Sequence, residues 1–389
     1  KLRASYGQVG NDVYTVGGVA QRFLYEEKWS QISNDYMFGT SGKSGIYETQ
    51  YPNYGVTWER AHKYNVGLEF GLWNGLLNGN IDLFHEKRND ILTNYLTRPE
   101  WVGVTMAAGN LGETVNSGFE IELKHNNHIG KEFQYNVGLT FSHAKNEIKN
   151  MDEPALKTDY RKREGHPIGQ YYGLVCDGFV TAADVADPNF PTSTFGNVQV
   201  GDLKYRDMNN DGFIDERDET FIGYSDVPEN TYALTLGCNY KGIGFSVMFQ
   251  GVDHVSRYYD AEAMYAFVSG GKVKEHHLDR WNPTKSESEN LASAKYPLLH
   301  YDSYGDHNQR QNSFFLKNGA FMRLKNIELS YTLPTKWIEK VGMSDCRLYV
   351  NGNNLITWDH LDDLCDPESN GSNRYPIMKT VNFGVNIKF

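Results

Sequence analysis

The sequence has 389 residues, with 38 Lys and Arg against 49 Asp and Glu, so its formal net charge is -11. This sign disfavours nucleic acid as a partner, because phosphate backbones bind surfaces with surplus Lys and Arg. Hydrophobic residues make up 39%, mean hydropathy is -0.59, and no segment approaches the roughly 18 apolar residues of a membrane-spanning helix. Membrane-spanning strands stay open, since they need only about 9–11 residues with every second one apolar.

Composition narrows the class of protein further. Aromatic residues are 14% of the chain, with 26 Tyr and 20 Phe against 4 Cys, which suits an outer-membrane barrel better than a cytosolic α/β enzyme. Cys176, Cys238, Cys346 and Cys365 lack the C-x-x-C spacing of a zinc site. A disulfide between Cys346 and Cys365 is compatible with an oxidising compartment, but the sequence does not require it.

Alternation of apolar and polar residues predicts ten β-strands. In chain order they span residues 1–7, 62–73, 79–96, 115–125, 133–143, 231–240, 243–252, 321–333, 346–354 and 381–389. The last strand ends in Gly384-x-x-Ile387-x-Phe389, which resembles the C-terminal assembly signal of bacterial outer-membrane barrels. Because Lys1 lies inside an alternating strand without a preceding Met or signal peptide, we expect the chain to be the C-terminal part of a longer polypeptide.

The segments between these strands alternate between long and short. The long ones are residues 8–61, 97–114, 144–230, 253–320 and 355–380, and the short ones are 74–78, 126–132, 241–242 and 334–345. In an up-and-down sheet, this order places all the short turns at one end of the strands. Outer-membrane barrels have this asymmetry, with short periplasmic turns and long extracellular loops, whereas Greek-key sandwiches do not require it. The sequence therefore predicts an all-β, transmembrane antiparallel barrel.

The two faces of the predicted strands differ in chemistry, so we assign one to lipid and one to the lumen. The residues expected to face lipid are Leu68, Phe70, Leu72, Phe119, Ile121, Leu123, Val137, Leu139, Phe141, Ile327, Leu329, Tyr331 and Leu333. The residues expected to face the lumen are Glu69, Glu120, Glu122, Asn136, Lys325, Glu328 and Ser330. Ten strands alone leave two unpaired edges, which lipid does not tolerate. We therefore expect the strands that close the barrel to precede this chain.

A series of short motifs resembles the SusC/RagA family of TonB-dependent outer-membrane transporters. They are Asn110-Leu-Gly112, Asn116-Ser-Gly-Phe-Glu-Ile-Glu-Leu123, Gly201-Asp-Leu-Lys-Tyr-Arg-Asp207, Asp211-Gly-Phe-Ile-Asp215, Arg280-Trp-Asn-Pro283, Phe321-Met-Arg-Leu-Lys-Asn-Ile-Glu-Leu-Ser-Tyr331, Tyr349-Val-Asn-Gly-Asn-Asn-Leu355, Asp366-Pro-Glu368 and the closing Phe389. They follow the family's order along the whole chain, and together they are specific although each alone is weak.

The resemblance implies a barrel of about 22 strands blocked by an N-terminal plug. Residues 1–389 would supply the last ten strands, and the plug, the TonB box and the other strands would lie outside this chain. The resemblance also implies import driven by the TonB–ExbB–ExbD complex through that N-terminal region. A SusD-like lipoprotein would cover the extracellular mouth.

One acidic segment of the long loop 144–230, residues 207–218, has the ligand spacing of a calcium-binding loop. Oxygen ligands are expected at loop positions 1, 3, 5, 7, 9 and 12, with Gly212 at the turn; they are Asp207, Asn209, Asp211, the Phe213 carbonyl, Asp215 and Asp218. Asp218 is shorter than the glutamate usual at the last position. The alternative is an Asx-turn loop without metal. We favour calcium because the spacing matches at every position, and we assign it a structural role because no nucleophile or base accompanies the segment.

Catalytic and substrate-binding residues are not recognisable in the sequence, so we predict that the protein is not an enzyme. His125, His128, His276 and His277 lack carboxylates at ligand spacing, and we interpret them as solvated loop residues. Aromatic residues of the long loops could stack on sugar rings; they are Tyr47, Tyr51, Tyr54, Trp58, Tyr171, Tyr172, Tyr258, Tyr259, Tyr265, Trp281, Tyr301 and Tyr304. The same side chains could pack on one another or on a partner, so none is assigned.

These observations leave several functions open. The favoured one is TonB-dependent import of nutrient oligomers across the outer membrane with a SusD-like lipoprotein, the cargo being an oligosaccharide in preference to a peptide. A siderophore or cobalamin receptor would share the barrel but act without the lipoprotein. A barrel-embedded hydrolase is disfavoured, and a soluble, calcium-stapled carbohydrate-binding β protein is the non-membrane alternative.

Overall fold

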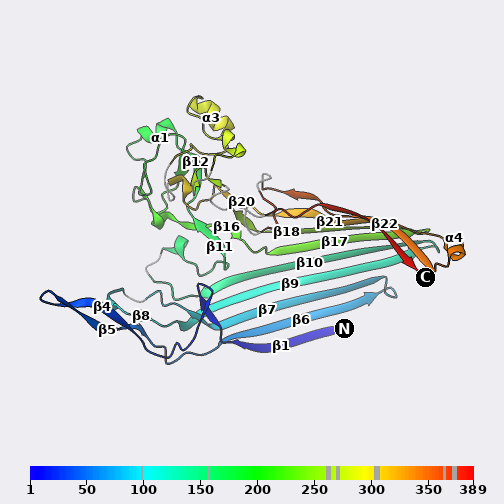
Figure 1. The fold of residues 1–389 in the computed structure, drawn as a ribbon, viewed down its shortest axis with the longest axis horizontal. Coiled ribbons are helices and arrows are strands. Elements are labelled where there is room, and N and C mark those ends of the chain that lie inside the picture. Colours follow the sequence, from blue (N-terminus) through cyan, green and yellow to red (C-terminus); the bar gives the residue numbers. More distant parts are fainter. Residues whose placement is uncertain are drawn as a thin grey trace. The chain divides into compact units, whose positions relative to one another are not determined.

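The main element of the structure is an antiparallel ten-stranded sheet (Figure 1). The structure is a computed structural model that describes residues 1–97, 100–155, 158–259, 264–268, 272–301, 307–361, 365–369 and 375–389. The sheet order is β1 (Leu2–Asn11), β6 (Glu59–Leu72), β7 (Leu77–Thr93), β9 (Gly109–Ile129), β10 (Phe133–Asn150), β17 (Asn230–Tyr240), β18 (Ile243–Asp253), β21 (Phe321–Thr332), β22 (Asp345–Asp359) and β23 (Thr380–Lys388). All ten predicted strands are confirmed, and each pairs with its predicted neighbours in chain order.

Several strands are longer than alternation predicted. β9 begins at Gly109 rather than near residue 115, β10 continues to Asn150, and β22 continues to Asp359 opposite Phe321. The residues added to β10 are mostly polar, because the part of a barrel strand that extends beyond the hydrocarbon needs no apolar face. A Cβ on Gly109 would lie 2.5 Å from the Tyr95 hydroxyl, so a larger residue there would displace the tyrosine side chain.

The turns and long connections alternate as predicted. Short turns occupy residues 73–76, 130–132, 241–242 and 333–344, and long connections occupy 12–58, 94–108, 151–229, 254–320 and 360–379. The tightest turn is Lys241-Gly242, where φ is +50° and +86°, the pattern of a two-residue hairpin turn that follows strand twist. A Cβ on Gly242 would lie 2.7 Å from the Thr332 carbonyl oxygen, so glycine is required.

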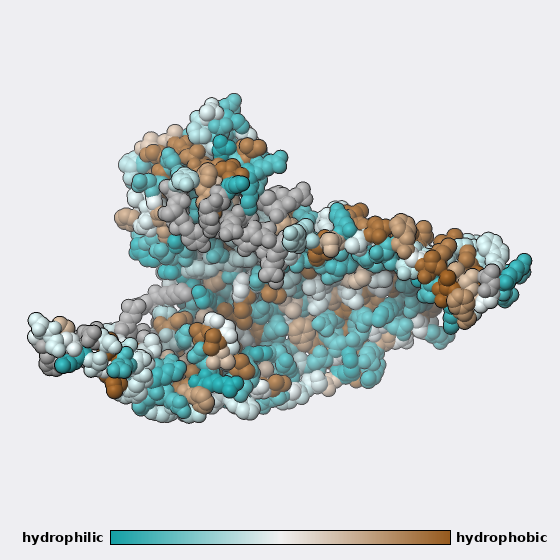
Figure 2. Space-filling model, viewed as in Figure 1, coloured by the Kyte–Doolittle hydropathy of each residue, from teal (hydrophilic) through white to brown (hydrophobic). Residues whose placement is uncertain are grey.

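The strand register sorts side chains onto two chemically different faces. One cross-strand row is Ile243, Tyr331, Leu348 and Val385, and the next row on that face is Phe245, Leu329, Val350 and Phe383. Rows on the other face alternate with these. The first is Gly244, Ser330, Tyr349 and Gly384, and the second is Ser246, Glu328, Asn351 and Asn382. Leu329 is 51% exposed and Phe383 is 83% exposed. Figure 2 shows hydrophobic side chains over the ends of β22 and β23, an exposed apolar surface that suits lipid.

A bulge in β21 changes which residues share a face. The pairing with β18 shifts between Met248 and Phe249, and Lys325 is the extra residue on β21. An inserted residue reverses the alternation that follows it. In a regular strand, residues 325 and 328 would lie on opposite faces. The bulge explains how Lys325 and Glu328 both lie on the polar face, as the sequence analysis expected.

The long connections contain secondary structure that alternation did not predict. Small strands are β2 (Tyr14–Val16), β3 (Val19–Gln21), β4 (Lys28–Phe38), β5 (Ser41–Tyr51), β8 (Thr105–Met106), β11 (Gln170–Gly173), β12 (Cys176–Phe179), β13 (Thr192–Ser193), β14 (Leu203–Tyr205), β15 (Phe213–Ile214), β16 (Thr220–Ser225), β19 (Ser256–Tyr258) and β20 (Leu316–Asn318). Short helices are α1 (Ala182–Ala186), α3 (Glu287–Ser293) and α4 (Thr335–Ile338), with 3-10 helices η1 (Glu100–Val102), η2 (Asp159–Arg161), η3 (Glu216–Asp218), η5 (Glu275–Asp279), η6 (His307–Gln309) and η7 (Glu339–Val341). Among the described residues, every helix is too short or too polar to cross a membrane.

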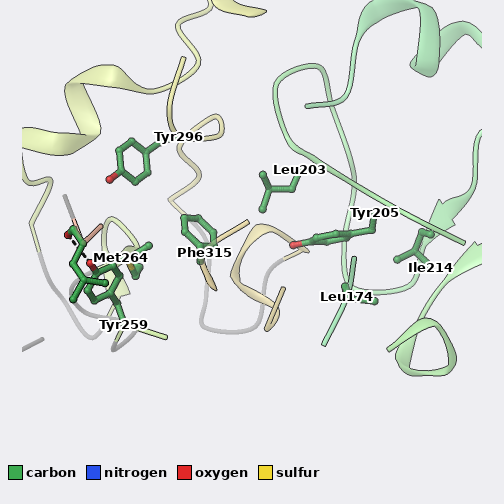
Figure 3. Close-up of a cluster of buried hydrophobic side chains, with 9 residues drawn as sticks. Leu174, Leu203, Tyr205, Ile214, Tyr259, Met264, Tyr296 and Phe315 are labelled. Carbon is green, nitrogen blue, oxygen red and sulfur yellow. Dashed lines mark hydrogen bonds between the residues drawn. The ribbon is translucent and has the colours of Figure 1, made fainter. Parts of the chain in front are cut away.

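By its internal contacts the chain divides into two compact units. One comprises residues 1–70, 80–120 and 144–168, and the other comprises 71–79, 121–143 and 169–389. The first has a small buried cluster of Leu24, Ala107 and Ala108. The second has a larger one, here called the loop core: Leu174, Leu203, Tyr205, Ile214, Tyr259, Met264, Tyr296, Phe315 and Leu361 (Figure 3). All four cysteines are free thiols, so the Cys346–Cys365 disulfide is not formed.

Candidate functional site

The loop core joins three long connections that are far apart in sequence. Leu174, Leu203 and Ile214 come from residues 151–229, Phe315 comes from 254–320, and Leu361 comes from 360–379. Leu174, Leu203 and Leu361 are fully buried. A hydrogen bond of 2.6 Å from the Tyr259 hydroxyl to the Leu361 carbonyl also links two of the connections (Figure 3). The three connections therefore form one packed body rather than separate loops.

The predicted calcium segment, residues 207–218, is anchored to the loop core at two points, one just before the segment and one within it. Tyr205 and Ile214 are buried, and the Tyr205 hydroxyl donates to the His307 carbonyl at 2.9 Å. Within the segment, Asn210 and Gly212 have φ of +57° and +82°, which folds the chain sharply. Glycine adopts this conformation without a steric penalty.

The acidic side chains of the segment bind its own backbone. Asp207 accepts from the Gly212 N–H at 2.8 Å, Asn209 Oδ1 from the Asp211 N–H at 3.0 Å, and Asp211 from the Phe213 N–H at 3.0 Å. The bonds of Asn209 and Asp211, each to the N–H two residues on, are those of Asx turns, whereas the Asp207 bond spans the turn as a whole. This arrangement matches both of the readings that the sequence left open, an Asx-turn loop and a calcium loop.

Phe213 lies in β15, which pairs in parallel with β13. The carbonyls of Gly212 and Ile214 accept from the Thr192 and Thr194 N–H groups, each at 3.0 Å. Successive carbonyls of a strand point to opposite edges, so the Phe213 carbonyl points away from β13. That direction is required if it is to serve as a backbone ligand.

Asp218 closes the segment from a fully buried position. Its two carboxylate oxygens accept from the Met208 N–H and the Asp215 N–H, each at 2.9 Å. Asp218 thus joins the start of the segment to its end. A buried carboxylate is stable only when such donors satisfy it.

The positively charged side chain of Arg217 contacts two of the predicted ligands. The Arg217 guanidinium lies 2.9 Å from Asp211 Oδ2 and 2.7 Å from Asp215 Oδ2. The hydrogen bonds that the Arg217 guanidinium donates to Asp215, together with the charges of Asp211 and Asp215, raise the pKa of Arg217. Among the described residues, no group of three or more His, Cys, Asp or Glu side chains stands ready to hold a metal ion. Calcium at residues 207–218 therefore remains a prediction.

A buried ion cluster escaped the sequence analysis. Arg323 is 1% exposed and contacts Asp366 at 2.8 Å and Glu368 at 2.6 Å, and Lys325 contacts Glu368 at 2.9 Å. Asp366 also accepts from the Glu368 N–H at 2.9 Å. These ion pairs hold the segment 365–369 against β21. The motifs that contain these residues, Phe321–Tyr331 and Asp366–Glu368, were recognised in the sequence. The ion pair between them joins residues 43 positions apart, and no sequence pattern predicts such a contact.

The predicted aromatic residues range from buried through half-buried to exposed. Tyr259 and Trp281 are each 3% exposed and pack in the interior, whereas Tyr54, Trp58 and Tyr301 are 77%, 65% and 86% exposed. Tyr304 lies outside the described residues. The exposed residues are the most accessible to a ligand.

The interpretation of His277 as a solvated residue is wrong. Its side chain is buried, Nδ1 accepts from the Lys274 N–H at 3.0 Å, and Nε2 donates to the Met264 carbonyl at 2.9 Å. Burial, with the charges of Lys274 and Arg280, lowers its pKa. Burial beside His277 and Lys274 lowers the pKa of His276 to about 4. A lone histidine pair in sequence gives no indication of this packing.

Ten antiparallel strands with an exposed apolar face and alternating turn lengths define part of a β-barrel of the outer membrane. Comparison with known proteins gives the family. Residues 1–355 match the family described as TonB dependent receptor-like, beta-barrel, so the chain belongs to it. This confirms the predicted fold class, the outer-membrane location and the SusC/RagA type.

Individual relatives agree with this assignment. TonB-dependent receptor P3 of Formosa agariphila is 26% identical over 423 residues, which cover 100% of this chain and 39% of that protein. TonB-dependent receptor SusC of Bacteroides thetaiotaomicron is 25% identical, covering 100% of this chain and 37% of SusC. A solved structure of the RagAB peptide importer in its open-open state has a TM-score of 0.69 at 22% identity, covering 100% of this chain and 40% of that one. The chain thus spans about 40% of the length of the proteins it matches.

Proposed function

We propose that the complete protein imports a nutrient oligomer across the outer membrane, an oligosaccharide in preference to a peptide. The observation that carries the proposal is the family match over residues 1–355. The polar face of the sheet, with Asn351 and Asn382 in one row with Glu328, is consistent with a wall that lines an aqueous passage. The cargo would cross unchanged, since no catalytic constellation is recognisable in the sequence.

Two partners follow from the same proposal. The TonB–ExbB–ExbD complex would supply energy through the N-terminal region of the complete protein. A SusD-like lipoprotein would cover the extracellular mouth, where the long connections lie in this reading. The SusC similarity and the RagAB structure support a transporter of this paired type, although RagAB itself is described as a peptide importer.

Uptake by intact cells tests the proposal. We expect deletion of the gene to abolish growth on one class of oligomer, and complementation with the full-length gene to restore it. A complementing protein that lacks its TonB box should not restore growth. Co-purification of a surface lipoprotein separates this function from that of a siderophore or cobalamin receptor, which would act without one. Recovery of the full-length protein in the soluble fraction would contradict the membrane assignment itself.

We also propose that residues 207–218 bind one structural Ca²⁺ through Asp207, Asn209, Asp211, the Phe213 carbonyl, Asp215 and Asp218. The oxygen donors are the kind that Ca²⁺ prefers, and their spacing is that of a twelve-residue calcium loop. The direction of the Phe213 carbonyl and the closing position of Asp218 support the proposal. Arg217 would have to turn away from Asp211 and Asp215 for the ion to enter.

Limited proteolysis of the full-length protein tests calcium. We expect EGTA to expose residues 151–229 to trypsin, and the double variant Asp207→Ala with Asp211→Ala to be cut equally with or without EGTA. The barrel should stay assembled in both cases, because the ten strands do not depend on this segment. Asp279→Ala, a change of an exposed acid outside the segment, is the matched control. Identical digestion of the wild type with and without EGTA would rule out the metal.

A further inference from the structure

Two exposed aromatic side chains of the connection 12–58 are held by one carboxylate. Trp29, in β4, donates its indole N–H to Glu27 at 3.4 Å, and the Tyr54 hydroxyl donates to the other oxygen of Glu27 at 3.2 Å. Trp29 is 57% exposed and Tyr54 is 77% exposed. Because the polar edge of each ring is bound, the two rings are held near one another while much of their surface stays open.

The backbone beneath these side chains is anchored. The Asn53 N–H donates to the Leu24 carbonyl at 2.8 Å, and the Asn53 side chain donates to the Ala108 carbonyl at 2.9 Å. Leu24 and Ala108 belong to the buried cluster of this unit. Tyr54 therefore projects from a packed base, which lowers the entropy that a ligand must remove on binding.

The second anchor is the hairpin of β4 and β5, labelled in Figure 1. Trp29 lies opposite Glu48 in the register, and the Thr49 hydroxyl donates to the Lys28 carbonyl at 2.9 Å. The hairpin thus fixes the backbone of Trp29 and places a second carboxylate beside it.

We propose that Trp29, Glu27 and Tyr54, with Glu48 at their side, form a glycan-binding platform. The apolar C–H faces of a sugar would lie on the exposed rings, as amphipathic aromatic side chains allow. Its hydroxyl groups would donate to the carboxylates, which are acceptors only. The ligand class is a neutral oligosaccharide of at least two sugar units, because two separate rings are offered.

A cationic peptide is the competing ligand, since cations also bind carboxylates and aromatic faces. Both oxygens of Glu27 already accept hydrogen bonds from the Trp29 indole and the Tyr54 hydroxyl. The lone pairs of Glu27 that remain free can accept a hydrogen bond from a hydroxyl group more readily than they can form an ion pair. The observations therefore favour the glycan.

The platform rests on the proposed import function for its biological meaning, and it narrows the cargo to a glycan. Binding can be measured without transport, so the two proposals can fail separately. Loss of binding with normal uptake of the same oligosaccharide would remove the platform alone. Binding by a protein whose gene deletion leaves uptake unchanged would remove the import function alone.

The experiment uses the purified full-length protein in detergent. A glycan array identifies the neutral oligosaccharide that the wild type binds best, and titration calorimetry then measures its affinity. We expect Trp29→Ala and Tyr54→Ala each to weaken binding roughly tenfold, the order expected for losing an aromatic contact. Tyr54→Phe, which keeps the ring but loses the bond to Glu27, should weaken it less. Trp101→Ala, at an 85% exposed tryptophan of the same unit, should leave the affinity unchanged.

Three results would overturn the platform. The first is a wild type that gives no signal for any neutral glycan on the array. The second is an affinity that Trp29→Ala and Tyr54→Ala leave as it was. The third is tight binding of penta-lysine that these two substitutions abolish. Circular dichroism and heat-modifiable gel migration of each variant exclude unfolding as the cause of a loss.

Discussion

The ten-stranded sheet and the loop core place the same residue types in opposite environments. In the sheet, Leu329 is 51% exposed and Phe383 is 83% exposed, on a face where apolar rows cross four strands. In the loop core, Leu174 and Leu203 are fully buried. The sheet exposes leucine because its surroundings are lipid, whereas the loop core buries leucine because its surroundings are water. Burial alone therefore does not identify the structural residues of this protein.

Polar groups show the reverse contrast. The connections bury Asp218 and His277, and Arg323 of β21 is buried where it meets Asp366 of the connection 360–379; each has identified hydrogen-bond or ion-pair partners. A buried polar group is costly unless it is paired, so each such pair fixes one geometry of the connections. The structure of the sheet is determined by the alternation of apolar and polar residues. The structure of the connections is determined by individual pairs of buried polar groups.

The largest expected effect is at Arg323. Arg323→Ala leaves the carboxylates of Asp366 and Glu368 without their buried partner, a loss of about 3–5 kcal/mol. We expect residues 365–369 to detach from β21, and hydrogen exchange of their amides to accelerate by two or more orders of magnitude. Lys325→Ala is the control, since Lys325 is more exposed and touches only Glu368. Equal exchange in the two variants would contradict a specific role of the buried guanidinium.

The second prediction compares one leucine from each region. Leu203→Ala should destabilise the loop core by about 2–5 kcal/mol, because a fully buried side chain leaves a cavity. Leu329→Ala should have a much smaller effect, since lipid or detergent fills the space. Leu329→Arg should cost about 2–4 kcal/mol if the residue lies near the middle of the bilayer. Urea titration in detergent measures all three, and a tolerated arginine would show that this face does not meet lipid.

These regions also differ in how far the sequence alone predicted them. All ten strands, their order and the alternation of turns follow from period-two patterns, because a barrel strand needs one face for lipid along its length. The packing of Leu174 with Phe315 and Leu361 could not be predicted, since it joins residues from three connections with no common period. The bond between Trp29 and Glu27 lies within three residues, yet Trp29 was not singled out, because exposure is invisible in sequence.

For the candidate calcium site, the sequence contained no indication of the cation that pairs with two of the proposed ligands. Asp218 accepts from the Met208 and Asp215 N–H groups, and its role as the last calcium ligand stays a prediction. Arg217 did not enter the sequence-based prediction of the calcium site. Its guanidinium turns back onto Asp211 and Asp215 because η3 begins at Glu216 and reverses the chain. A local helical turn of this kind has no periodic signal to read.

The third prediction concerns pH and the histidines of the connection 254–320. The pKa of His276 is lowered to about 4 and that of His277 is lowered, whereas in the unfolded chain both titrate near 6.5. Between about pH 6.5 and 4 the unfolded state thus binds more protons, so the stability of this region falls as pH falls. Protonation of His277 Nδ1 would also break the bond from the Lys274 N–H. Hydrogen exchange at a series of pH values, corrected for intrinsic rates, measures the slope.

The variant His276→Phe sharpens this third prediction. It removes one titrating group and keeps a ring against Tyr296, whose centroid lies 5.1 Å from that of His276. The pH slope should become shallower, whereas His128→Phe, at an exposed histidine, should leave it unchanged. A slope that is the same in wild type and His276→Phe would contradict the lowered pKa as its cause.

The smallest expected effect is at Arg217, and it connects the calcium proposal to the paired polar groups of the connections. Arg217→Ala removes the cation that contacts Asp211 and Asp215 without touching the bonds of Asp218. Since the guanidinium is exposed, unfolding should hardly change. If calcium and Arg217 compete for the same carboxylates, the variant should bind calcium more tightly, on the order of a few-fold in titration calorimetry. Arg206→Ala, which pairs with Asp177 outside the segment, should leave the affinity unaltered. An unchanged or weakened affinity in Arg217→Ala would mean that the guanidinium and the ion do not share a position.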